Sequence, residues 1–370
     1  MLILKLAIIT ELFHPHVGGQ EIRYFDFCKE LMEQGHEVKI FTVRYNQRLP
    51  STENFGQIKI HRYAFSPRYV RGISRDIASV LNYSIQTGVR IPKVSSFDAV
   101  IFNQWPLFPV LFSEPLCRTT TIVDWCEPWP TGLINAFQKM ISHLPDGHTT
   151  VSDHIRLWLM RNYNIQSDKI ESIPSAVRTS LYKSHIEDKD FGKVVFVGRL
   201  AKHKRLDVLA KAIKIARKKC PEITLDIIGP GSIHGIQNGE INSSKSFIKI
   251  HGLLPDDEKI RHLKKAWVLA VLSEREGFPR VVAEALAAGT PIITSDFPEN
   301  GTRNIVRKTN AGIVCTPSPQ DVAETLIKLY NNANLWKKLS HNAVKSASQY
   351  ELSKVTRKLI AFIQNLSGVN

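Results

Sequence analysis

The sequence lacks the features of a secreted or membrane-spanning protein. Its cysteines are odd in number, scattered, and never spaced as a C-x-x-C pair, which argues against a disulfide framework or a zinc site and favours a reducing compartment. They are Cys28, Cys117, Cys126, Cys220 and Cys315. No run reaches the roughly 18 apolar residues of a membrane-spanning helix. The opening MLILKLAIIT has no small-residue cleavage site and is followed by Glu11, so it predicts a buried first strand rather than a signal peptide. We therefore expect a cytoplasmic protein.

Two further absences disfavour common ligand classes. No G-x-G-x-x-G follows an expected strand, which argues against a dinucleotide-dependent oxidoreductase. Where the basic excess is densest, in 193–219, the lysines and arginines are not interleaved with a set of aromatic residues, so nucleic-acid binding is disfavoured despite a pI near 9.6.

Positive charge is present in excess, and it is unevenly distributed. The formal net charge is +15; residues 1–180 carry 19 Lys and Arg against 16 Asp and Glu, and the remainder carries 30 against 18. The excess is densest in 193–219. A solvated basic face is the ordinary explanation for most of these lysines. A phosphate-bearing ligand, a polyanionic partner or an anionic membrane surface would also attract them.

Short β-branched runs alternate with longer amphipathic ones along the chain. We expect strands at KLAIIT, EVKIFTV, DAVIFN and TTTIVD, and a helix at EIRYFDFCKELMEQG that ends at Gly35. The polar stretch 179–192 interrupts the alternation. It restarts with KVVFVG, a helix from about His203 to Lys219, and then ITLDIIG, FIKIHG, WVLAVL and TPIIT.

This alternation predicts an α/β protein, because strands that alternate with helices form parallel sheets with helical crossovers. A length of 370 residues favours two domains. We predict two doubly wound, Rossmann-like domains, 1–178 and 193–345, facing each other across a cleft. A last helical segment, 346–370, has no docking place that the sequence defines.

Two loops after expected strands carry residues suited to an anionic ligand. Gly18 and Gly19 open a helix after the first strand, so the backbone can approach a ligand with the positive helix end behind it. Arg199 and Lys204 follow KVVFVG, and a planar guanidinium beside a point charge suits a diphosphate. By spacing alone, a structural role for Arg199 and Lys204 is as well supported as a ligand-binding one. A glycine pair such as Gly18 and Gly19 also often occurs in a turn that binds no ligand.

The segment EREGFPRVVAEALAAGTPII repeats this strand–loop–helix geometry. Glu276 lies in the loop, Pro279 suits the first helical position, and Glu284 projects from the helix. Gly277 and Phe278 place backbone N–H groups beside a helix N-terminus, where anions are stabilised. Two carboxylates here could accept the vicinal hydroxyls of a sugar ring and of ribose. A capping carboxylate and an ordinary helical glutamate are the simpler alternative.

Together these motifs resemble the retaining glycosyltransferases of family 4, which have the two-domain GT-B fold. The matching motifs, in order, are PHVGGQE (15–21), QGHEV (34–38), FVGRLAKHKRLD (196–207), HGLLP (251–255) and EGFPRVVAEALAAGTPII (276–293). The last contains the E-x7-E pattern of that family. The resemblance covers nearly the whole chain.

The resemblance implies a role for each motif. Arg199 and Lys204 would hold the donor diphosphate and stabilise the leaving nucleotide. Glu276 would contact hydroxyls of the donor sugar, and Glu284 the ribose. The residues implied in donor binding are Gly18, Gly19, Gly198, His251, Leu253, Gly277, Phe278, Pro279 and Glu284. The donor would be a UDP- or GDP-sugar, and the acceptor a glycan, a lipid-linked molecule or a small molecule. Such enzymes transfer the sugar by a front-face route without a firmly placed protein nucleophile.

The chain departs from the family pattern at several positions. Asp124 stands in a loop that often carries a histidine, and we expect it to take the sugar- or acceptor-facing role. The common glycine after the binding lysine is Arg205, and the interdomain P-N-G-V is PSAV (174–177). A D-K-D run (188–190) resembles the metal motif of the other glycosyltransferase fold, but no strand precedes it, so we expect solvated surface there. The expectation is therefore an enzyme without a cofactor or a required metal.

Two other functions remain open on the same motifs. A nucleotide-sugar epimerase or hydrolase would form its product without an acceptor. A non-catalytic sugar-nucleotide-binding partner would bind the donor and never release free nucleotide.

A basic and aromatic stretch, HRYAFSPRYVRGISR (61–75), contains no acidic residue. Such mixtures suit a lipid headgroup region, so peripheral contact with an anionic membrane on the cytoplasmic face is a further expectation. An exposed loop that shapes the acceptor cleft explains the stretch equally well.

Overall fold

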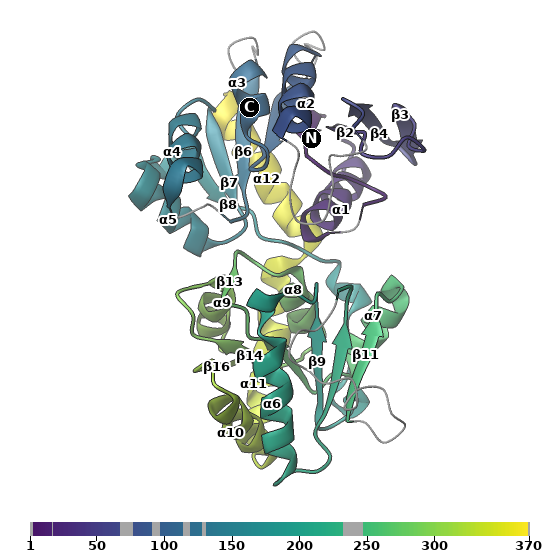
Figure 1. Ribbon diagram of the computed structural model, residues 1–370, viewed down its shortest axis with the longest axis vertical. Coiled ribbons are helices and arrows are strands. Elements are labelled where there is room, and N and C mark those ends of the chain that lie inside the picture. Colours follow the sequence, from purple (N-terminus) through teal and green to yellow (C-terminus); the bar gives the residue numbers. More distant parts are fainter. Residues whose placement is uncertain are drawn as a thin grey trace. The chain divides into compact units, whose positions relative to one another are not determined.

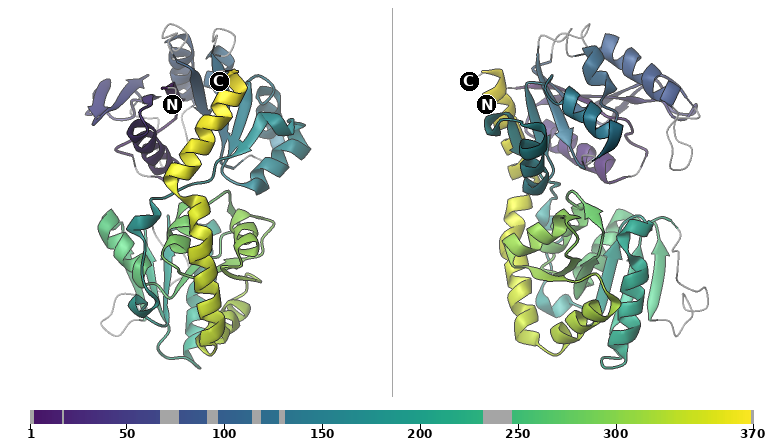
Figure 2. Two further views of the ribbon diagram at one scale, coloured as in Figure 1. Left: turned by 180° about the vertical axis from the view of Figure 1, so that it is seen from behind. Right: turned by 60° about the vertical axis from the view of Figure 1, so that its left-hand side comes forward.

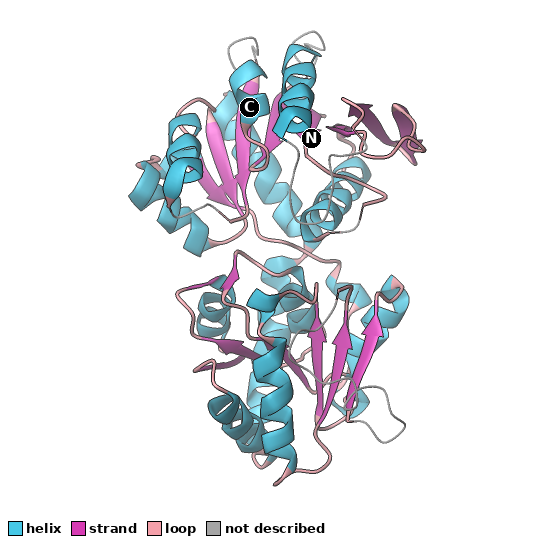
Figure 3. Ribbon diagram, viewed as in Figure 1, coloured by secondary structure: helices cyan, strands magenta, loops and turns pink. Residues whose placement is uncertain are grey.

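The computed structural model describes residues 3–16, 18–66, 77–90, 97–113, 119–127, 131–231 and 247–368. The chain divides into two compact units, drawn in Figure 1. Unit 1 comprises Met1–Pro174 together with Leu352–Asn370, and unit 2 comprises Ser175–Glu351. In each unit helices cover a largely parallel sheet (Figure 3), so the predicted α/β class is confirmed. In the described part of the chain, no helix combines the length and the apolar character needed to span a membrane.

Unit 1 is built on a sheet with the strand order β3-β4-β2-β1-β5-β6-β7-β8. Its strands are β1 (Lys5–Ile9), β2 (Glu37–Val43), β3 (Thr52–Phe55), β4 (Ile58–Tyr63), β5 (Ala99–Asn103), β6 (Thr120–Trp125), β7 (Gly147–Thr150) and β8 (Ile170–Ser172). Its helices are α1 (Gly19–Glu33), α2 (Ile77–Arg90), α3 (Phe108–Ser113), α4 (Gly132–Ile141), α5 (Asp153–Tyr163), the short η2 (Ser167–Lys169) and α12 (Leu352–Ser367). Only β3 runs antiparallel, at the edge beside β4.

The four strands expected in this half are confirmed as β1, β2, β5 and β6. Their interiors are buried because each lies between two neighbours under covering helices, as continuous β-branched runs indicate. Helix α1 ends as expected, since Gly35 adopts a φ of 90° that favours glycine. The sequence did not reveal the hairpin of β3 and β4, whose polar strands carry a weak pattern.

The last helix, α12, belongs to unit 1 although it follows unit 2 in the chain (Figure 2). Lys358 Nζ contacts Ser172 O at 2.9 Å and Glu171 Oε1 at 2.8 Å. Beneath the helix, a Cβ at Gly147 would lie 2.3 Å from the side chain of Leu366, so the absence of a side chain lets α12 approach β7. The final helix therefore completes the cover of the first sheet.

Unit 2 is built on a fully parallel sheet with the order β11-β10-β9-β12-β14-β16. Its strands are β9 (Lys193–Val197), β10 (Thr224–Ile228), β11 (Ile248–Gly252), β12 (Val268–Val271), β14 (Ile292–Ser295), β16 (Gly312–Cys315), and the short pair β13 (Arg275–Glu276) and β15 (Glu299–Asn300). Its α-helices are α6 (Leu206–Arg217), α7 (Asp256–Lys265), α8 (Arg280–Ala287), α9 (Gly301–Thr309), α10 (Pro319–Tyr330) and α11 (Ala333–Ala347). Its 3-10 turns are η3 (Thr179–Leu181), η4 (Ile186–Asp188), η5 (Lys202–Lys204) and η7 (Ser348–Tyr350).

The two segments by which the chain enters and leaves unit 2 lie side by side. Val177 forms a β-bridge with Glu351, and its N–H donates to Tyr350 O at 3.0 Å. Thr179 Oγ1 also donates to the carboxylate of Glu351. The PSAV segment, which replaces a glycine-containing motif of the family, is thus held by a bridge to the end of unit 2.

Two helix starts differ from those expected. The helix expected from His203 begins at Leu206, because Lys202–Lys204 form a 3-10 turn and Arg205 has the left-handed φ of 54°. Pro279 is the N-cap of α8 rather than its first residue. Gly289, with a φ of 64°, follows the end of α8.

Candidate functional site

The loops after β9 and β12 are neighbours, because these two strands are adjacent in the parallel sheet of unit 2. Carboxyl ends of parallel strands meet at one edge of a sheet, where ligand sites of such folds form. A backbone hydrogen bond of 2.8 Å from Glu274 N to His203 O joins the two loops. This edge brings together Lys204 from the first loop and Glu276 from the second.

Lys204 and Glu276 form an ion pair at this edge. Lys204 Nζ contacts Glu276 Oε1, and the same oxygen accepts a 2.8 Å hydrogen bond from Ser273 Oγ. The two charged side chains retain 16% and 13% of their exposure, so the pair is sheltered and still reachable from solvent. A cation and a carboxylate placed in this way can bind an anionic group and a set of hydroxyls side by side.

A chain of buried polar groups holds the loop that carries Glu276. Ser295 Oγ donates to Ser273 O at 2.9 Å. Asn300 Nδ2 donates to Ser295 Oγ at 3.0 Å, and Asn300 Oδ1 caps α9 by accepting from Thr302 N at 3.1 Å. Asn300 is fully buried. Because every member is paired, the network fixes the position of the Glu276 carboxylate.

Gly301 lets this loop lie close to α9. A Cβ at Gly301 would lie 2.4 Å from Gly277 O and 2.8 Å from Glu276 O. No side chain fits at such distances without moving the backbone. The first position of α9 therefore supports the geometry of the Glu276 loop.

The remaining residues of the β9 loop surround Lys204. Arg199 is exposed, and Gly198 precedes it with a φ of 153°. A Cβ at Gly229, in the turn after β10, would lie 2.0 Å from Gly198 O, so the two turns pack backbone to backbone. Arg205 occupies the position where the family commonly has glycine, and its left-handed conformation explains that preference.

Helix α8 carries the other predicted residues of this segment. Phe278 is 8% exposed and its ring lies 5.2 Å from the ring of Tyr350, so its side chain belongs to the core. A ligand would meet Phe278 through its backbone, as the sequence analysis expected of Gly277 and Phe278. Pro279 sets the N-cap of the helix.

Glu284 is buried in unit 2, with 2% exposure. Its Oε1 accepts a 3.0 Å hydrogen bond from Tyr182 Oη, and it lies 3.5 Å from Lys259 Nζ and 3.2 Å from Arg280 Nε. Burial raises the pKa of Tyr182, and the neighbouring Glu284 carboxylate adds to that rise. The carboxylate therefore accepts one hydrogen bond and forms ion pairs with two cations.

The HGLLP segment places its two predicted residues differently. Leu253 is 63% exposed. His251, the next-to-last residue of β11, lies against Asp226 of β10, with His251 Nε2 3.3 Å from Asp226 Oδ1. Leu253 is thus free for a ligand contact, whereas His251 belongs to a side-chain cluster.

In unit 1, Gly18 and Gly19 begin α1 as expected. Gly18 is the N-cap with an extended backbone, and Ile22 N donates to Gly18 O at 3.1 Å. A Cβ at Gly19 would meet nothing within 4 Å. The first turn of α1 therefore has open space beside its backbone, and the positive end of the helix lies behind it.

The surroundings of Asp124 differ from those expected of a residue that faces a sugar or an acceptor. It lies at the end of β6 with 1% exposure. Its carboxylate pairs with Arg23 and accepts hydrogen bonds from Tyr24 Oη at 2.8 Å and Thr149 Oγ1 at 2.7 Å. Burial opposes the charge on Arg23, but its neighbours Asp124, Cys126 and Tyr24 together raise the Arg23 pKa. Asp124 is thus the centre of a buried ion-pair network.

Gln20 connects this network to the glycine turn. Its Nε2 donates to Asp124 Oδ2 at 3.1 Å, and its Oε1 accepts from Cys126 Sγ at 2.8 Å. Gln20 directly follows Gly19 in the first turn of α1. Gln20 therefore connects the Asp124 network to the first turn of α1.

The D-K-D run corrects a second expectation, since it is not simply solvated surface. Lys189 Nζ donates to Ala288 O at 2.7 Å and to Thr290 Oγ1 at 2.8 Å. Burial lowers the Lys189 pKa to about 7, although Asp188 opposes the shift. The run anchors the polar segment 179–192 to the end of α8.

A hollow of about 720 Å³ lies elsewhere in unit 2, along the edge strand β16 between α9 and α10. Its charged lining residues are Asp296, Arg307, Asp321, Glu324 and Lys328. It contains none of the residues predicted to bind the donor. The candidate site is therefore identified by its paired charges and not by the volume of this hollow.

Several supporting residues were missed by the sequence analysis. Ser273 lies two residues after β12, Ser295 is the last residue of β14, and Asn300 lies in the short β15; a polar residue near the end of a strand is the one signal that could have identified them. Arg23 is separated from Asp124 by about a hundred positions, and no local pattern connects the two.

Comparison with known proteins agrees with this arrangement. Residues 17–181 match the family model described as Glycosyltransferase Family 4, and residues 177–346 match that described as Glycosyl transferases group 1. The D-inositol 3-phosphate glycosyltransferase of Paenarthrobacter aurescens is 22% identical, with 90% of this chain and 89% of the relative aligned.

Two further proteins show partial or structural likeness. The poly(glycerol-phosphate) alpha-glucosyltransferase of Bacillus subtilis is 31% identical over 163 residues, which are 43% of this chain but only 24% of that relative. The solved structure "Trehalose-6-phosphate from E. coli bound with UDP-2-fluoro glucose" superposes with a TM-score of 0.74 at 12% identity, covering 99% of each chain. The two family models together span residues 17–346, and the chain belongs to the GT-B glycosyltransferases of family 4 type.

Proposed function

We propose that this glycosyltransferase takes its sugar from a nucleoside diphosphate donor, a UDP- or GDP-sugar, and retains the anomeric configuration. The observation that carries the proposal is the Lys204–Glu276 pair, which a buried polar network holds at the carboxyl edge of the unit 2 sheet. The solved structure bound with UDP-2-fluoro glucose supports a uridine nucleotide as the first donor to test.

The pair suggests how a donor would enter the site. A diphosphate carries more negative charge than one carboxylate, so it would compete with Glu276 for Lys204, and the exposed Arg199 would add a second cation. Glu276, released from Lys204 but still held by Ser273, would then accept hydroxyls of the sugar. Lys204 and Arg199 would stabilise the charge that develops on the leaving diphosphate.

Glu284 is proposed to accept the ribose hydroxyls. The calorimetric affinity of UDP, GDP, CDP and ADP should identify one preferred base, with the same affinity in the presence and absence of magnesium. Glu284→Gln preserves the acceptor for Tyr182. We expect it to lower the affinity for the preferred nucleotide about 10- to 100-fold, because a hydrogen bond to a charged group is lost. Glu324→Gln, on the exposed surface of α10, serves as the matched control. Equal binding by both variants would remove Glu284 from the donor site.

Transfer itself should distinguish this function from the alternatives. A glycosyltransferase releases free nucleotide at a rate that depends on the acceptor, whereas an epimerase or hydrolase forms product without one. NMR of the product reports the anomeric configuration, and inversion would contradict the retaining proposal. Turnover in EDTA is expected to match turnover in magnesium, in keeping with an enzyme that needs no metal for transfer.

The acceptor is proposed to be lipid-linked, with unit 1 in peripheral contact with an anionic membrane on the cytoplasmic face. The observation that favours this is an exposed aliphatic stripe on α2. Ile77, Leu81, Ile85 and Val89 recur every fourth residue, with exposures of 73%, 37%, 46% and 46%. Such spacing places them on one helix face. The basic stretch 61–75 precedes α2 in the sequence; its residues 67–75 lie outside the described ones.

Sedimentation with phosphatidylglycerol vesicles at low salt tests the membrane contact. The wild type is expected to sediment, and to be released as salt screens the lipid charge. The double change Leu81→Gln and Ile85→Gln should reduce the bound fraction several-fold, since it removes apolar area from the stripe. Leu157→Gln, at a 45% exposed position on α5, is the control and should bind like wild type. A wild type that stays in the supernatant would rule out this mode of contact.

A further inference from the structure

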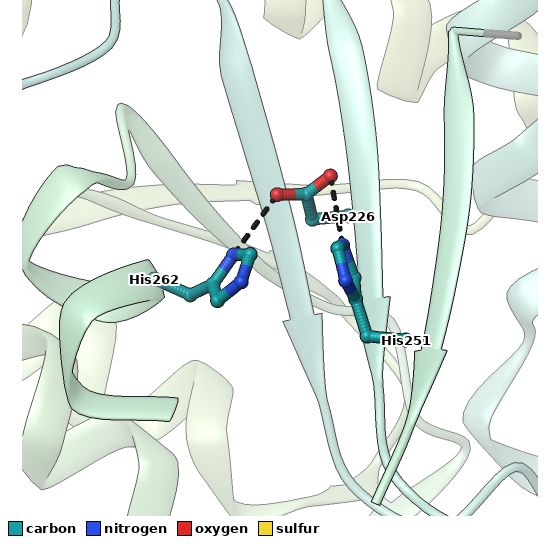
Figure 4. Close-up of side chains that lie close together, drawn as sticks. All are labelled: Asp226, His251 and His262. Atoms are coloured by element: carbon teal, nitrogen blue, oxygen red, sulfur yellow. Dashed lines mark hydrogen bonds and ion pairs between the residues drawn. The ribbon is translucent and has the colours of Figure 1, made fainter. Parts of the chain in front are cut away.

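One cluster of potential metal ligands lies outside the proposed transfer chemistry. Asp226 from β10, His251 from β11 and His262 from α7 converge on one point, as Figure 4 shows. Each offers a ligand atom, and these atoms all lie within 4.8 Å of one another. The cluster is partly open, since the two imidazoles are each 24% exposed and the carboxylate is 7% exposed.

The parallel pairing of β10 and β11 explains how two of these residues meet. Asp226 is paired in register with Lys249, and His251 lies two positions beyond Lys249, so Asp226 and His251 point to the same face of the sheet. A register shift after Ile227 draws Gly252 level with Ile228 and moves His251 towards Asp226. Helix α7 covers this face and supplies His262 from its last turn.

The distances in the cluster suit a tetrahedral metal ion. His262 Nδ1 lies 3.0 Å from Asp226 Oδ2, and His251 Nε2 lies 3.3 Å from Asp226 Oδ1. Ligand atoms about 2.0–2.1 Å from a zinc ion at tetrahedral angles are about 3.3 Å apart. Two of the separations are therefore close to those of a tetrahedral site, although they reach different oxygens of Asp226, and the widest separation, up to 4.8 Å, would have to close for the side chains to share one ion.

One ring nitrogen of the cluster is left without a hydrogen bond. His251 Nε2 is buried and has no hydrogen-bond partner among the described residues, although Asp226 is near, because the geometry is out of line. A buried polar atom without a partner is costly in a folded protein. A metal ion between His251 and Asp226 would satisfy this nitrogen.

The charge of the cluster also favours a cation. Asp226 is 5% exposed, and its described side-chain contacts are the two imidazoles. The ammonium of Lys193, which acts electrostatically on His262, is paired with Asp190. A buried carboxylate is favoured when it is paired or coordinates a metal.

We propose that Asp226, His251 and His262 bind a divalent transition metal ion, zinc in the cell, with the fourth coordination position open to water or a ligand. Two imidazoles and one carboxylate suit zinc, whereas magnesium and calcium prefer oxygen ligands. The ion fastens β10, β11 and α7 to one another at the edge of the unit 2 sheet. It has a structural role, separate from the Lys204–Glu276 pair.

This proposal differs from the expectation drawn from the cysteines. The scattered cysteines exclude only a thiolate zinc site. The three ligands come from two strands and a helix, at separations that match no short zinc motif, so they can be recognised only in the fold.

Metal binding is tested on the full chain after chelation and dialysis. Calorimetry should show one Zn²⁺ bound per chain, and Co²⁺ should give the visible absorption of a tetrahedral site. Saturating zinc is expected to raise Tm by on the order of 5 °C, because a ligand bound only to the folded state stabilises it. Magnesium and calcium at the same concentration should leave Tm unchanged. Absence of saturable zinc binding to the wild type would overturn the proposal.

Variants locate the site. His262→Gln and Asp226→Asn should each lower the affinity for zinc at least tenfold and abolish the zinc-dependent rise in Tm. His341→Gln changes an exposed histidine on α11 and should bind zinc like wild type. Far-UV circular dichroism of the zinc-free variants checks that they are folded. Zinc binding that is equal in all three variants would place the ion elsewhere. Since these readouts do not use turnover, they stand apart from the proposed donor and transfer reaction.

Discussion

Glu276→Gln is expected to lower kcat/KM by about 10²- to 10³-fold while the protein stays folded. The magnitude is that of removing one well-placed electrostatic contact to a transition state in a sheltered site. Glutamine keeps the acceptor for Ser273 Oγ but loses the charge that pairs with Lys204. The loss should therefore fall on turnover and leave the network behind the loop in place.

Lys204→Met provides the second half of the test. If Lys204 and Glu276 act on the same donor, as proposed, their effects should not add: the double variant is expected to be little worse than the poorer single variant. Steady-state kinetics with a nucleotide sugar and circular dichroism of each variant measure the two properties separately. Lys204→Met should also lower the affinity for the free nucleoside diphosphate, whereas Glu276→Gln should lower mainly the affinity for the sugar-bearing donor.

A neighbouring loop residue serves as the control. Glu274 also lies between β12 and α8 and contacts a cation, Arg205, at 3.5 Å, but it is 46% exposed and has no role in the proposal. Glu274→Gln should keep kcat/KM within about threefold of wild type, because exposed ion pairs contribute little. Wild-type turnover in both Glu276→Gln and Lys204→Met would remove the pair from the reaction.

The sequence located the Glu276 loop because its signals are local. A buried strand, a carboxylate in the segment after it, and a helix with glycine after its end follow one another within 268–289, and the structure has them in that order as β12, the short β13 that carries Glu276, and α8. The residues that hold the loop in place are distant from it in the sequence. Ser295 lies in β14 and Asn300 in β15. Ser295 meets Ser273, and Asn300 meets Ser295, only because β14 lies beside β12 in the sheet.

The docking of the last helix and the metal-ligand cluster were hidden for the same reason. The pattern of 352–367 predicts a helix with an apolar face, but the glycine that accepts it, Gly147, lies some two hundred positions earlier. His251 and His262 became a cluster only when the register shift in β11 and the course of α7 were known. Local periodicity identifies elements, whereas partners across a sheet depend on strand order.

Asp124 shows how a buried partner changes the interpretation of a residue. In the sequence it is a polar residue after a strand, which is the usual place of a ligand contact. In the structure its carboxylate lies against Arg23, whose NH2 also donates to Ile173 O at 2.8 Å. Breaking a buried ion pair by removing one charge typically costs about 3–5 kcal/mol, because the other charge is left without compensation. We therefore expect Asp124→Ala to lower the free energy of unfolding by that amount.

A double-mutant cycle identifies the cause of this loss. Arg23→Met alone should also lower the free energy of unfolding strongly. The double variant Arg23→Met with Asp124→Ala should lower it by less than the sum of the two single changes, since no unpaired charge remains. Hydrogen exchange read by mass spectrometry locates the effect: peptides of β6, β7 and α1 should lose protection, and those of the unit 2 sheet should keep it. Thr149→Val is the milder control, since it removes one hydrogen-bond donor to the carboxylate and leaves the ion pair.

The outcome also decides what Asp124 does for transfer. If Asp124 positions the first turn of α1 through Gln20, then Gln20→Ala should reproduce part of the loss in turnover at nearly full stability. Asp124→Asn keeps the size of the side chain and accepts from Thr149, so its stability should lie between those of wild type and Asp124→Ala. A variant Asp124→Asn with wild-type stability and no turnover would instead return this carboxylate to the sugar- or acceptor-facing role expected from the sequence. The buried network predicts that variants of Asp124 lose hydrogen-exchange protection in unit 1, and that any loss of turnover accompanies this loss of protection.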